Sequence, residues 1–535
     1  MNKIYKVVWS KAKHAYVVTS EVAKSHTKSA SGKAVKAALA AAVGMGVLMG
    51  GYTANAADTT TGSGSGVAYG TGSNAPKAEN VAIGKDATIS YSGGVGMPST
   101  GDIVIGNKAK TNNYIDQGGG IAIGSNSFVE NMVGGLERSF DFNQAGYNSM
   151  FGVPYGLPKH PDKMVTGVAI GQNTYARSGS VMLGTHNYKG ALGDVTVDSA
   201  DVRSHNLLPF ATELGANSYS HGLFSSVTGA YSIISSNYGS NSSAASKNFG
   251  ATITGSLNSI ESATSSSNYS GVANSIVGTA NRTANSNGSL IFGAGNEITN
   301  SITSISAPSG NSTSAKDLAD TLRAAVKRSK SGGATLAIGG GNKADYTQKT
   351  SIIGVNNTVT GTSGSPSTYN SITGYNNTAT NINHVSVIGS ENNVTNTNGA
   401  VVFGDKRTLT GADGSVVIGS SQAGTSTSVK NAVAIGSEAN VTKEGGVALG
   451  AGSVASVDKG VAGYDPGTGT NSTDTSSVWK STQAAVSVGD TSKGITRQIT
   501  GVAAGTNDTD AVNVAQLRKA KTSIVAAAST EVRAG

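Results

Sequence analysis

Short runs of apolar residues that end in a glycine recur along most of the chain, and polar residues separate them. In residues 384–420 (HVSVIGSENNVTNTNGAVVFGDKRTLTGADGSVVIGS) the runs end at Gly389, Gly404 and Gly419, which stand fifteen residues apart. Similar runs, such as VAIG, IVIG and SIIG, occur on both sides of this segment. Their glycines are Gly84, Gly106, Gly124, Gly171, Gly184, Gly293, Gly339, Gly354, Gly374, Gly436 and Gly450.

Each run has the alternation of a β-strand. In SVVIG, Val416 and Ile418 face one side of the strand, whereas Ser415 and Val417 face the other. Gly419 follows where the chain turns a corner, because a positive φ or a close approach there suits glycine. A second small or apolar position recurs five residues after these glycines. It is occupied by Ile89, Val129, Ala176, Ile298, Val359, Ala379, Val394, Leu409, Val441 and Ala455.

Two short strands and two corners use about fourteen residues, so each repeat predicts one coil of a parallel β-roll. Stacking places each strand about 4.8 Å from the next, and backbone amides then pair between coils. The sequence therefore predicts an all-β fold, a parallel β-roll (solenoid) head built from coils of about 14–15 residues.

The core of such a roll is thin, because each coil supplies few apolar residues. Opposite the Val and Ile face the strands often carry alanine, as at Ala82, Ala122, Ala169, Ala434 and Ala448. We expect this alanine face to be covered as well. The chain has no cysteine for disulfides, so other copies of the same chain are the natural cover. The repeat alone leaves the number of copies open.

The composition agrees with a repeat of this kind. With 73 glycines, 5% aromatic and 13% charged residues, the chain fits either a β-rich repeat or disorder. Disorder is the alternative for residues 215–290, where apolar positions such as Val227 and Ile253 nevertheless favour degenerate coils. A calcium-binding roll is disfavoured, because Asn, Ser or Lys follows most corner glycines where that repeat needs Asp.

The net charge of +8 is concentrated at the N-terminus, where residues 1–57 hold eight lysines and one acid, Glu21. The remainder is close to neutral, so no nucleic-acid partner is expected. The apolar stretch Ala37–Met49 and the small residues after it predict a secretory signal peptide cut near Ala56 or Ala57. A basic nucleic-acid-binding arm is the disfavoured alternative. The long basic region resembles the extended signal peptide of large bacterial autotransported proteins, which implies a Gram-negative-type envelope.

Two insertions depart from the repeat. Residues 134–165 concentrate aromatic side chains, which form either a ligand-contact surface or a small core beneath a loop. These candidate contacts are Phe140, Phe142, Tyr147, Phe151 and Tyr155. Residues 312–332 carry apolar residues at helical spacing, early acids and late bases, and predict a helix that packs on the roll.

No catalytic constellation is recognisable. Thiol chemistry is excluded because there is no cysteine, and the histidines lack the spacing of a metal motif. Outside the leader they are His160, His186, His205, His221 and His384, which we interpret as loop residues. We therefore expect no enzyme activity, no catalytic residue, no cofactor and no metal site.

The C-terminal end carries the most specific pattern. Residues 494–518 (GITRQITGVAAGTNDTDAVNVAQLR) resemble the neck of trimeric autotransporter adhesins, the YadA-like family, and residues 463–490 resemble an insert found before that neck. Asp508, Thr509 and Asp510 are predicted to start a helix, and Leu517 and Ile524 stand one heptad apart. The neck motif comprises Asp508, Thr509, Asp510, Ala511, Val512, Asn513, Val514, Gln516 and Leu517.

The resemblance implies a left-handed parallel β-roll head, a neck and the start of a trimeric coiled-coil stalk. The domains are then a removed extended signal peptide (1–57), an N-terminal head roll (58–191) with the insertion 134–165, a main head roll (192–455) with degenerate coils 215–290 and the helical insertion 312–332, a head insert (456–493), the neck (494–518) and the start of the stalk (519–535).

The function implied by the family is that of a homotrimeric cell-surface adhesin, exported by type Vc secretion, which binds multivalently. Its partners are two further copies of the chain and a host matrix protein, a host-cell receptor or another bacterium. The alternatives are a non-binding spacer of a larger surface fibre and a polysaccharide-acting solenoid enzyme. The family's C-terminal membrane anchor is not recognised before Gly535, which predicts either a fragment or a secreted head.

Overall fold

The computed structural model describes residues 5–10, 15–20, 61–92, 101–114, 118–131, 166–187, 210–235, 247–262, 270–302, 305, 315–328, 335–422 and 424–534. The chain divides into two compact units, Met1–Thr59 and Thr60–Gly535. In the first unit, strands β1 (Tyr5–Ser10) and β2 (Ala15–Ser20) form an antiparallel pair. The predicted cleavage residues Ala56 and Ala57 lie outside the described residues.

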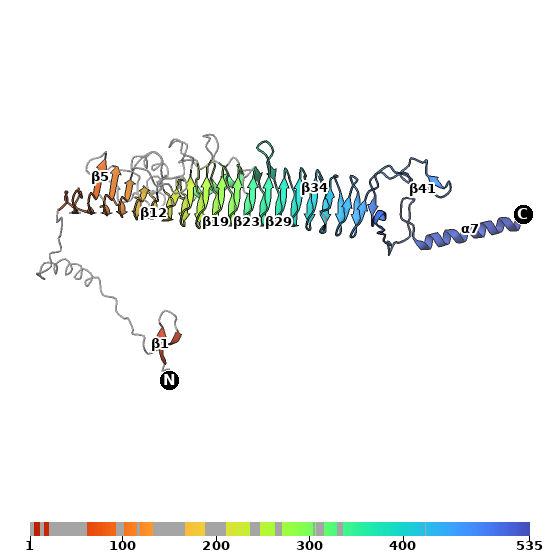
Figure 1. Cartoon of the computed structure of the whole chain (residues 1–535), viewed down its shortest axis with the longest axis horizontal. Coiled ribbons are helices and arrows are strands. Elements are labelled where there is room, and N and C mark those ends of the chain that lie inside the picture. Colours follow the sequence, from red (N-terminus) through yellow and green to blue (C-terminus); the bar gives the residue numbers. More distant parts are fainter. Residues whose placement is uncertain are drawn as a thin grey trace. The chain divides into compact units, whose positions relative to one another are not determined.

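The second unit contains a stack of coils whose strands form long parallel ladders (Figure 1). The ladder that we call the first sheet is open, because its end strands β3 and β43 each pair with one neighbour. Its strands, in order, are β3 (Val67–Tyr69), β4 (Val81–Ile83), β6 (Ile103–Ile105), β8 (Ile121–Ile123), β10 (Val168–Ile170), β12 (Val181–Thr185), β13 (Thr212–Ala216), β15 (Ser226–Thr228), β17 (Thr252–Thr254), β19 (Ser275–Thr279), β21 (Leu290–Ala294), β23 (Leu336–Gly340), β26 (Ser351–Val355), β29 (Ser371–Tyr375), β31 (Ser386–Ser390), β33 (Val401–Phe403), β35 (Val416–Ile418), β37 (Val433–Ile435), β39 (Val447–Leu449) and β43 (Val486–Ser487).

The second side of each coil forms further parallel ladders, which we call the second sheet. The first of them joins β5 (Thr88–Ser92), β7 (Lys110–Tyr114), β9 (Phe128–Asn131) and β11 (Tyr175–Arg177). The longest joins β14 (Tyr219–Ser220), β16 (Ile233–Ser235), β18 (Ser259–Glu261), β20 (Arg282–Ala284), β22 (Glu297–Thr299), β24 (Lys343–Asp345), β27 (Thr358–Thr360), β30 (Thr378–Thr380), β32 (Asn393–Thr395), β34 (Thr408–Thr410) and β36 (Ser426–Thr427). The last joins β38 (Asn440–Val441) and β40 (Val454–Ala455). These ladders confirm the predicted all-β roll.

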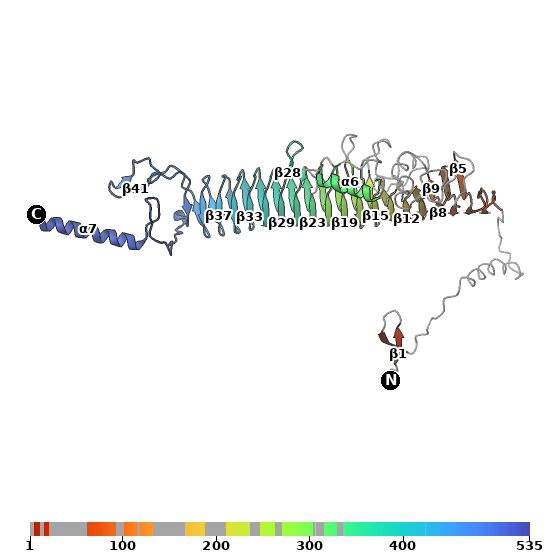
Figure 2. The same ribbon diagram turned by 180° about the vertical axis from the view of Figure 1, so that it is seen from behind.

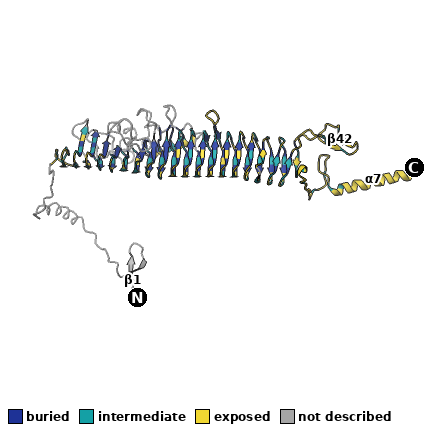
Figure 3. Ribbon diagram, viewed as in Figure 1, coloured by how far each residue is buried: buried dark blue, intermediate teal, exposed yellow. Residues whose placement is uncertain are grey.

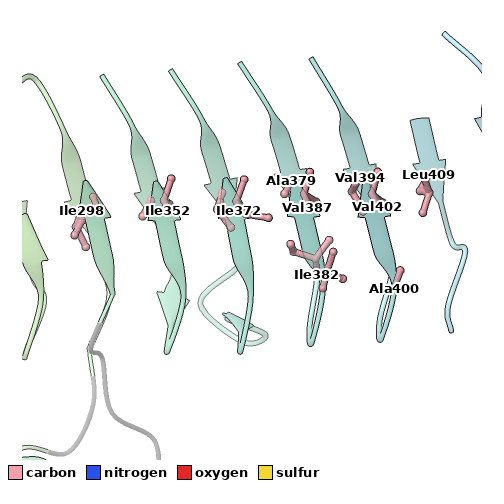
Figure 4. Close-up of a cluster of buried hydrophobic side chains, with 14 of the residues drawn as sticks. Ile298, Ile352, Ile372, Ala379, Ile382, Val387, Val394, Ala400, Val402 and Leu409 are labelled. Carbon is pink, nitrogen blue, oxygen red and sulfur yellow. The ribbon is translucent and has the colours of Figure 1, made fainter. Parts of the chain in front are cut away.

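The interior of the roll is filled by one residue from each side of a coil. Figure 4 shows such residues, with Ala379 of β30 near Val387 of β31, and Figure 3 shows the buried positions along the stack. Every member of the second apolar series, from Ile89 to Ala455, is at most 1% exposed. The series thus supplies the interior of the second sheet.

The expectation that Val and Ile form the core while alanine faces outward is wrong for the first sheet. Ala82 and Ala434 are fully buried inside the coil, whereas Ile388 is 51% exposed and Ile435 is 40% exposed. In strands of three and of five residues alike, the second residue points inward, as Val387 and Ala434 do. Because side chains alternate, the residues on either side of it then lie on the outer face.

The fourteen predicted glycines all occupy the fourth position from the start of a first-sheet strand, either just after a three-residue strand or inside a five-residue one, with φ between 98° and 146°. Residues with a side chain rarely adopt this conformation. The corners also stack closely, since Gly354 pairs with Gly374 in the next coil. A Cβ on Gly354 would lie 1.9 Å from the Gly374 carbonyl oxygen. Glycine is therefore required there both by the backbone conformation and by the lack of space.

Buried asparagines from successive coils form a second ladder beside the glycines. The Asn357 amide donates to Asn342 Oδ1 (3.0 Å) and to the Gly374 carbonyl oxygen (2.8 Å). Arg407 occupies the same position one coil after the last asparagine, and its guanidinium donates to the Gly436 and Ala439 carbonyl oxygens. The asparagines are Asn258, Asn281, Asn296, Asn342, Asn357, Asn377 and Asn392. The ladder satisfies backbone groups that a buried corner leaves without partners.

The helix α6 (Ala315–Arg328) lies within the range 312–332, where the sequence predicts one. It follows β22 in the chain but packs on earlier coils, as Figure 2 shows. Leu318 and Leu322 contact a satellite core that includes Leu223, Phe249 and Val272. On the exposed side of the helix, Asp320 forms a salt bridge with Lys316, one helical turn earlier.

Smaller elements complete the described chain. Strands β25 (Thr347–Gln348) and β28 (Ser367–Thr368) pair in parallel within the roll. Beyond the last coils, β41 (Tyr464–Asp465) and β42 (Thr470–Asn471) pair antiparallel. A short 3-10 helix, η5 (Thr491–Lys493), precedes the neck, and helix α7 (Val514–Ala534) ends the described chain.

Candidate functional site

The outer face of the first sheet carries a row of exposed apolar side chains. Partners in successive strands align one to one, so Ile388, Phe403, Ile418, Ile435 and Leu449 stack in register. Each of them is between 37% and 51% exposed in the single chain. Thr373 interrupts the row, which then continues toward the N-terminus through Ile353, Ile338 and Phe292. An exposed apolar surface of this extent marks an interface.

The neck is fixed to the last coil of the roll by Arg497. Its guanidinium donates to the Ala451 carbonyl oxygen (2.6 Å), to the Val488 carbonyl oxygen (2.6 Å) and to Ser453 Oγ (3.0 Å). The guanidinium lies against Gly450, the last corner glycine. The Arg497 guanidinium thus satisfies carbonyl oxygens that a further coil would otherwise hydrogen-bond, and it marks the end of the roll.

Helix α7 begins at Val514 with Asn513 as its N-cap, not at Asp508–Asp510 as the sequence suggested. Asn513 Oδ1 accepts from the Gln516 amide (3.0 Å), and Gln516 Oε1 accepts from the Asn513 amide (3.2 Å). This reciprocal pair is a capping box. Asp510 instead accepts from the Thr506 and Asn507 amides and closes a turn. Asp510 therefore stabilises a turn that precedes the helix and does not cap the helix itself.

Gln516 also ties the helix back to the neck. Its side-chain amide donates to the Gly505 carbonyl oxygen (3.0 Å) and its Oε1 accepts from the Gly505 amide (3.1 Å). The Asn513 side-chain amide donates to the Val502 carbonyl oxygen (3.3 Å). Two side chains of the predicted neck motif therefore fold the preceding loop against the first turn of α7.

The apolar side chains of α7 are exposed, and the described part of the chain does not cover them. No residue of the helix is buried, and Leu517 and Ile524 are 65% and 69% exposed. Val514, Val525 and Val532 are exposed as well. A long helix gains most of its stability from packing, so this seam indicates a helical partner.

The buried carboxyl groups of Asp102 and Glu213 lie inside the N-terminal half of the roll. Asp102 accepts hydrogen bonds from Thr111 Oγ1 (2.6 Å) and the Gly120 amide (2.8 Å), although burial still raises its pKa. Glu213 occupies an inward position of β13, where burial raises its pKa well above the usual range and the Ser220 amide lowers it in part. Among the described residues, neither Glu213 oxygen has a hydrogen-bond partner of normal geometry.

The other predicted site residues fall in two groups. The insertion 134–165, with Phe140, Phe142, Tyr147, Phe151 and Tyr155, lies outside the described residues, as do His160 and His205. His186 and His384 lie at positions with φ of 56° and 55°, and His221 is 6% exposed.

The described part of the chain shows no group of three or more His, Asp or Glu side chains that could hold a metal ion. In the same residues, no helix combines the length and the apolar character that a membrane crossing requires.

Sequence reasoning missed the asparagine ladder and a stack of Lys349, Tyr369 and His384 on an exposed corner. A signal for both was present. The asparagines follow the corner glycines in the motifs GVNNT and GYNNT, and Tyr369 and His384 stand at the same phase of the fifteen-residue repeat. Residues at one phase stack in a roll, so phase alone predicts such contacts.

Comparison with known families first defines the class of protein. Residues 1–50 match the family described as "Extended Signal Peptide of Type V secretion system". Residues 498–534 match the family described as "Coiled stalk of trimeric autotransporter adhesin". The matches cover the leader and the neck with α7, and together they support an exported adhesin of the trimeric autotransporter type.

Two curated proteins share similar segments with the chain. "Autotransporter adhesin BadA" of Bartonella henselae is 65% identical over 72 residues, which is 14% of this chain and 2% of that protein. "Trimeric autotransporter adhesin AtaA" of Acinetobacter sp. (strain Tol 5) is 49% identical over 83 residues, which is 15% of this chain and 2% of that protein. The matched segments thus span a small part of each relative.

Proposed function

We propose that the chain forms the head, the neck and the first part of the stalk of a homotrimeric adhesin on the surface of a Gram-negative bacterium. The in-register apolar row on the first sheet carries this proposal. It needs a cover of equal length and equal repeat, which a second and third copy of the same roll supply. The exposed seam of α7 needs partners in the same way, and the match to the coiled-stalk family supports this assembly.

Adhesion would follow from the threefold display of each surface site. Three weak sites on one rigid head bind a surface with an avidity about 10²–10⁴-fold above that of one site. The ligands in view are matrix proteins, host-cell receptors and other bacteria. The leader would direct the chain through type Vc export to the cell surface.

The test measures the attachment of beads coated with the purified chain to immobilised matrix proteins, host cells and bacteria. We expect attachment by the wild-type chain and at least a tenfold loss in a variant that no longer assembles, such as I388D/I418D. A chain that is monomeric by light scattering, or beads that attach to none of these surfaces, would refute the proposal.

The aromatic insertion 134–165 is a candidate contact surface for this attachment. Its five aromatic side chains, Phe140, Phe142, Tyr147, Phe151 and Tyr155, stand in a chain with few aromatics. Aromatic side chains dominate many binding surfaces. Deletion of 134–165 is expected to weaken attachment without changing the mass of the assembly, and unchanged attachment would exclude the insertion as the contact surface.

A further inference from the structure

Three side chains from successive coils stack on an exposed corner of the roll. The rings of Tyr369 and His384 lie 4.6 Å apart at an interplanar angle of 12°. Lys349 Nζ lies 4.6 Å from the centre of the Tyr369 ring and 2.7 Å from its hydroxyl oxygen. Because Lys349 comes from the preceding coil and His384 from the following one, both faces of the Tyr369 ring are covered.

The stack stops at His384, because the next two coils carry glycine at the same position. The Gly399 amide donates to the Asn383 carbonyl oxygen (2.8 Å), and the Gly414 amide donates to the Asn398 carbonyl oxygen (2.8 Å). A Cβ on Gly399 would have no heavy atom within 4 Å. The face of His384 that points away from Tyr369 therefore borders an open position.

The far end of this open position is closed by Asn431. Its Oδ1 would lie 2.7 Å from a Cβ on Gly414. His384 and Gly414 are two coils apart, which corresponds to about 10 Å in a parallel sheet. The result is a slot with a planar ring at one end, an amide at the other and a floor of two glycines. Its length suits one saturated six-membered ring stacked on the imidazole.

A row of polar side chains runs beside the slot. Asn383 Nδ2 donates to Asn398 Oδ1 (3.1 Å), and Asn398 Nδ2 donates to Asp413 Oδ1 (3.1 Å). Lys430 Nζ lies 3.0 Å from Asp413 Oδ2 and balances its charge. Asp413 Oδ1 also accepts from the Asn398 backbone amide (2.8 Å), so Asp413 Oδ2 and Asn398 Oδ1 are the oxygens of this row that retain a lone pair for a further donor, and Asn398 is exposed. The row offers hydrogen bonds without a net charge.

We propose that this slot binds one pyranose ring of a neutral glycan. The apolar face of the sugar stacks on the His384 imidazole, and hydroxyl groups at its edge bond to Asn398, Asp413 and Asn431. A flat apolar face with polar groups around its rim is the complement of this slot. The inference deepens the proposed adhesive function and rests on it for its role, since three such slots on one head raise the avidity.

The test applies the purified full chain and two variants to an array of neutral glycans. G399Y continues the ring stack into the slot, and Tyr369 already adopts the required φ of 58° at this phase. H384N removes the ring with a residue that tolerates a positive φ. Both variants are expected to lose at least tenfold in glycan affinity. The matched control Y231N removes an exposed tyrosine with a φ of 52° elsewhere on the roll, and it should bind as wild type.

The outcomes separate the slot from the adhesive function. A chain that attaches to cells but binds no glycan, or whose glycan binding survives both variants, overturns the slot and leaves adhesion standing. The slot is also overturned if the two variants weaken attachment to a matrix protein but not binding to a glycan. If the wild-type chain binds a glycan and both variants abolish this binding, the slot is supported. If the coated beads nevertheless attach to no cell surface, that failure counts against the adhesive function alone.

Discussion

At the residue scale, the corner glycines place the strictest demand on the sequence. Gly354 has a φ of 127°, and a Cβ at this residue would lie only 1.9 Å from the carbonyl oxygen of Gly374 in the next coil. The pairing partner Gly374 repeats the same geometry. An exchange at one corner therefore strains its own coil and displaces its neighbour.

We expect Gly354→Ala to lower the stability of the folded chain by at least about 2 kcal/mol. Thermal unfolding followed by far-UV circular dichroism measures the loss. Gly364→Ala is the matched control, because a Cβ there would meet nothing within 4 Å and its φ is not positive. Equal melting temperatures for the two variants would show that the corner tolerates a side chain.

Glu213 gives a pH-dependent prediction. Burial raises its pKa, so the folded chain holds a proton that the unfolded chain releases above about pH 4.3. Stability therefore falls as the pH rises from this value toward the folded pKa. Replacement by a neutral side chain of the same shape removes this loss.

We expect Glu213→Gln to stabilise the chain at pH 7 by about 1–3 kcal/mol, with a difference that disappears below about pH 4. Melting temperatures of both chains across this pH range give the comparison. Glu444→Gln, at an exposed position, should change nothing. A gain that is independent of pH would mean that the charge of Glu213 is not the cause.

The sequence predicted the corner glycines and the two apolar series, because both follow from a short strict period. Its expectation that the Val and Ile set of the first sheet is inside is wrong. Alternation separates Val416 and Ile418 from Val417, but it does not say which set points to the interior. The structure buries the second residue of the strand, such as Val417, and leaves its neighbours on the outer face.

At the element scale, the asparagine ladder acts as one hydrogen-bonded unit across many coils. Asn357 is typical, with its side chain bonded to Asn342, to the Gly374 carbonyl oxygen and to the Asn377 amide. Asn342 and Asn377 are buried, so their polar groups have no access to water, and the Gly374 carbonyl is partly buried. Loss of one asparagine leaves several polar groups unsatisfied at once.

Asn357→Ala is expected to cost about 1–3 kcal/mol for each buried group that loses its partner. The control is Asn393→Ala on the exposed side of β32, which should cost little. Hydrogen exchange locates the effect, since amides of the flanking coils should lose protection first. Unaltered protection near residue 357 would argue against a cooperative ladder.

The start of α7 shows the same limit of sequence reasoning at this scale. Asp508, Thr509 and Asp510 have the composition of a helix start, yet Asn513 and Gln516 form the cap. Both sets satisfy the residue preferences of a cap. Only the fold of the neck decides between them, because Gln516 also binds Gly505.

At the scale of the whole molecule, the apolar row of the first sheet is the proposed interface between chains. Ile388 and Ile418 lie in this row, two coils apart and on the outer face. A carboxylate at such a position has water around it in a single chain but none in an assembled interface. Substitution should therefore spare the fold and weaken the oligomer.

We expect I388D/I418D to reduce the mass found by light scattering from three chains toward one at micromolar concentration. Thr378→Asp, at an exposed position of β30 on the opposite sheet, should remain trimeric. The circular dichroism spectrum checks that the roll persists. A double variant with the mass of the wild type would place the interface on another face.

The one-to-one pairing of corner glycines has a consequence for how such heads diverge. A segment that runs from one corner to the next can be duplicated or deleted without shifting any ladder out of register, since its two cut ends are equivalent. The column then grows or shrinks by about 4.8 Å for each unit. The length of the head can thereby change by one coil at a time, while the surfaces of the remaining coils stay as they were.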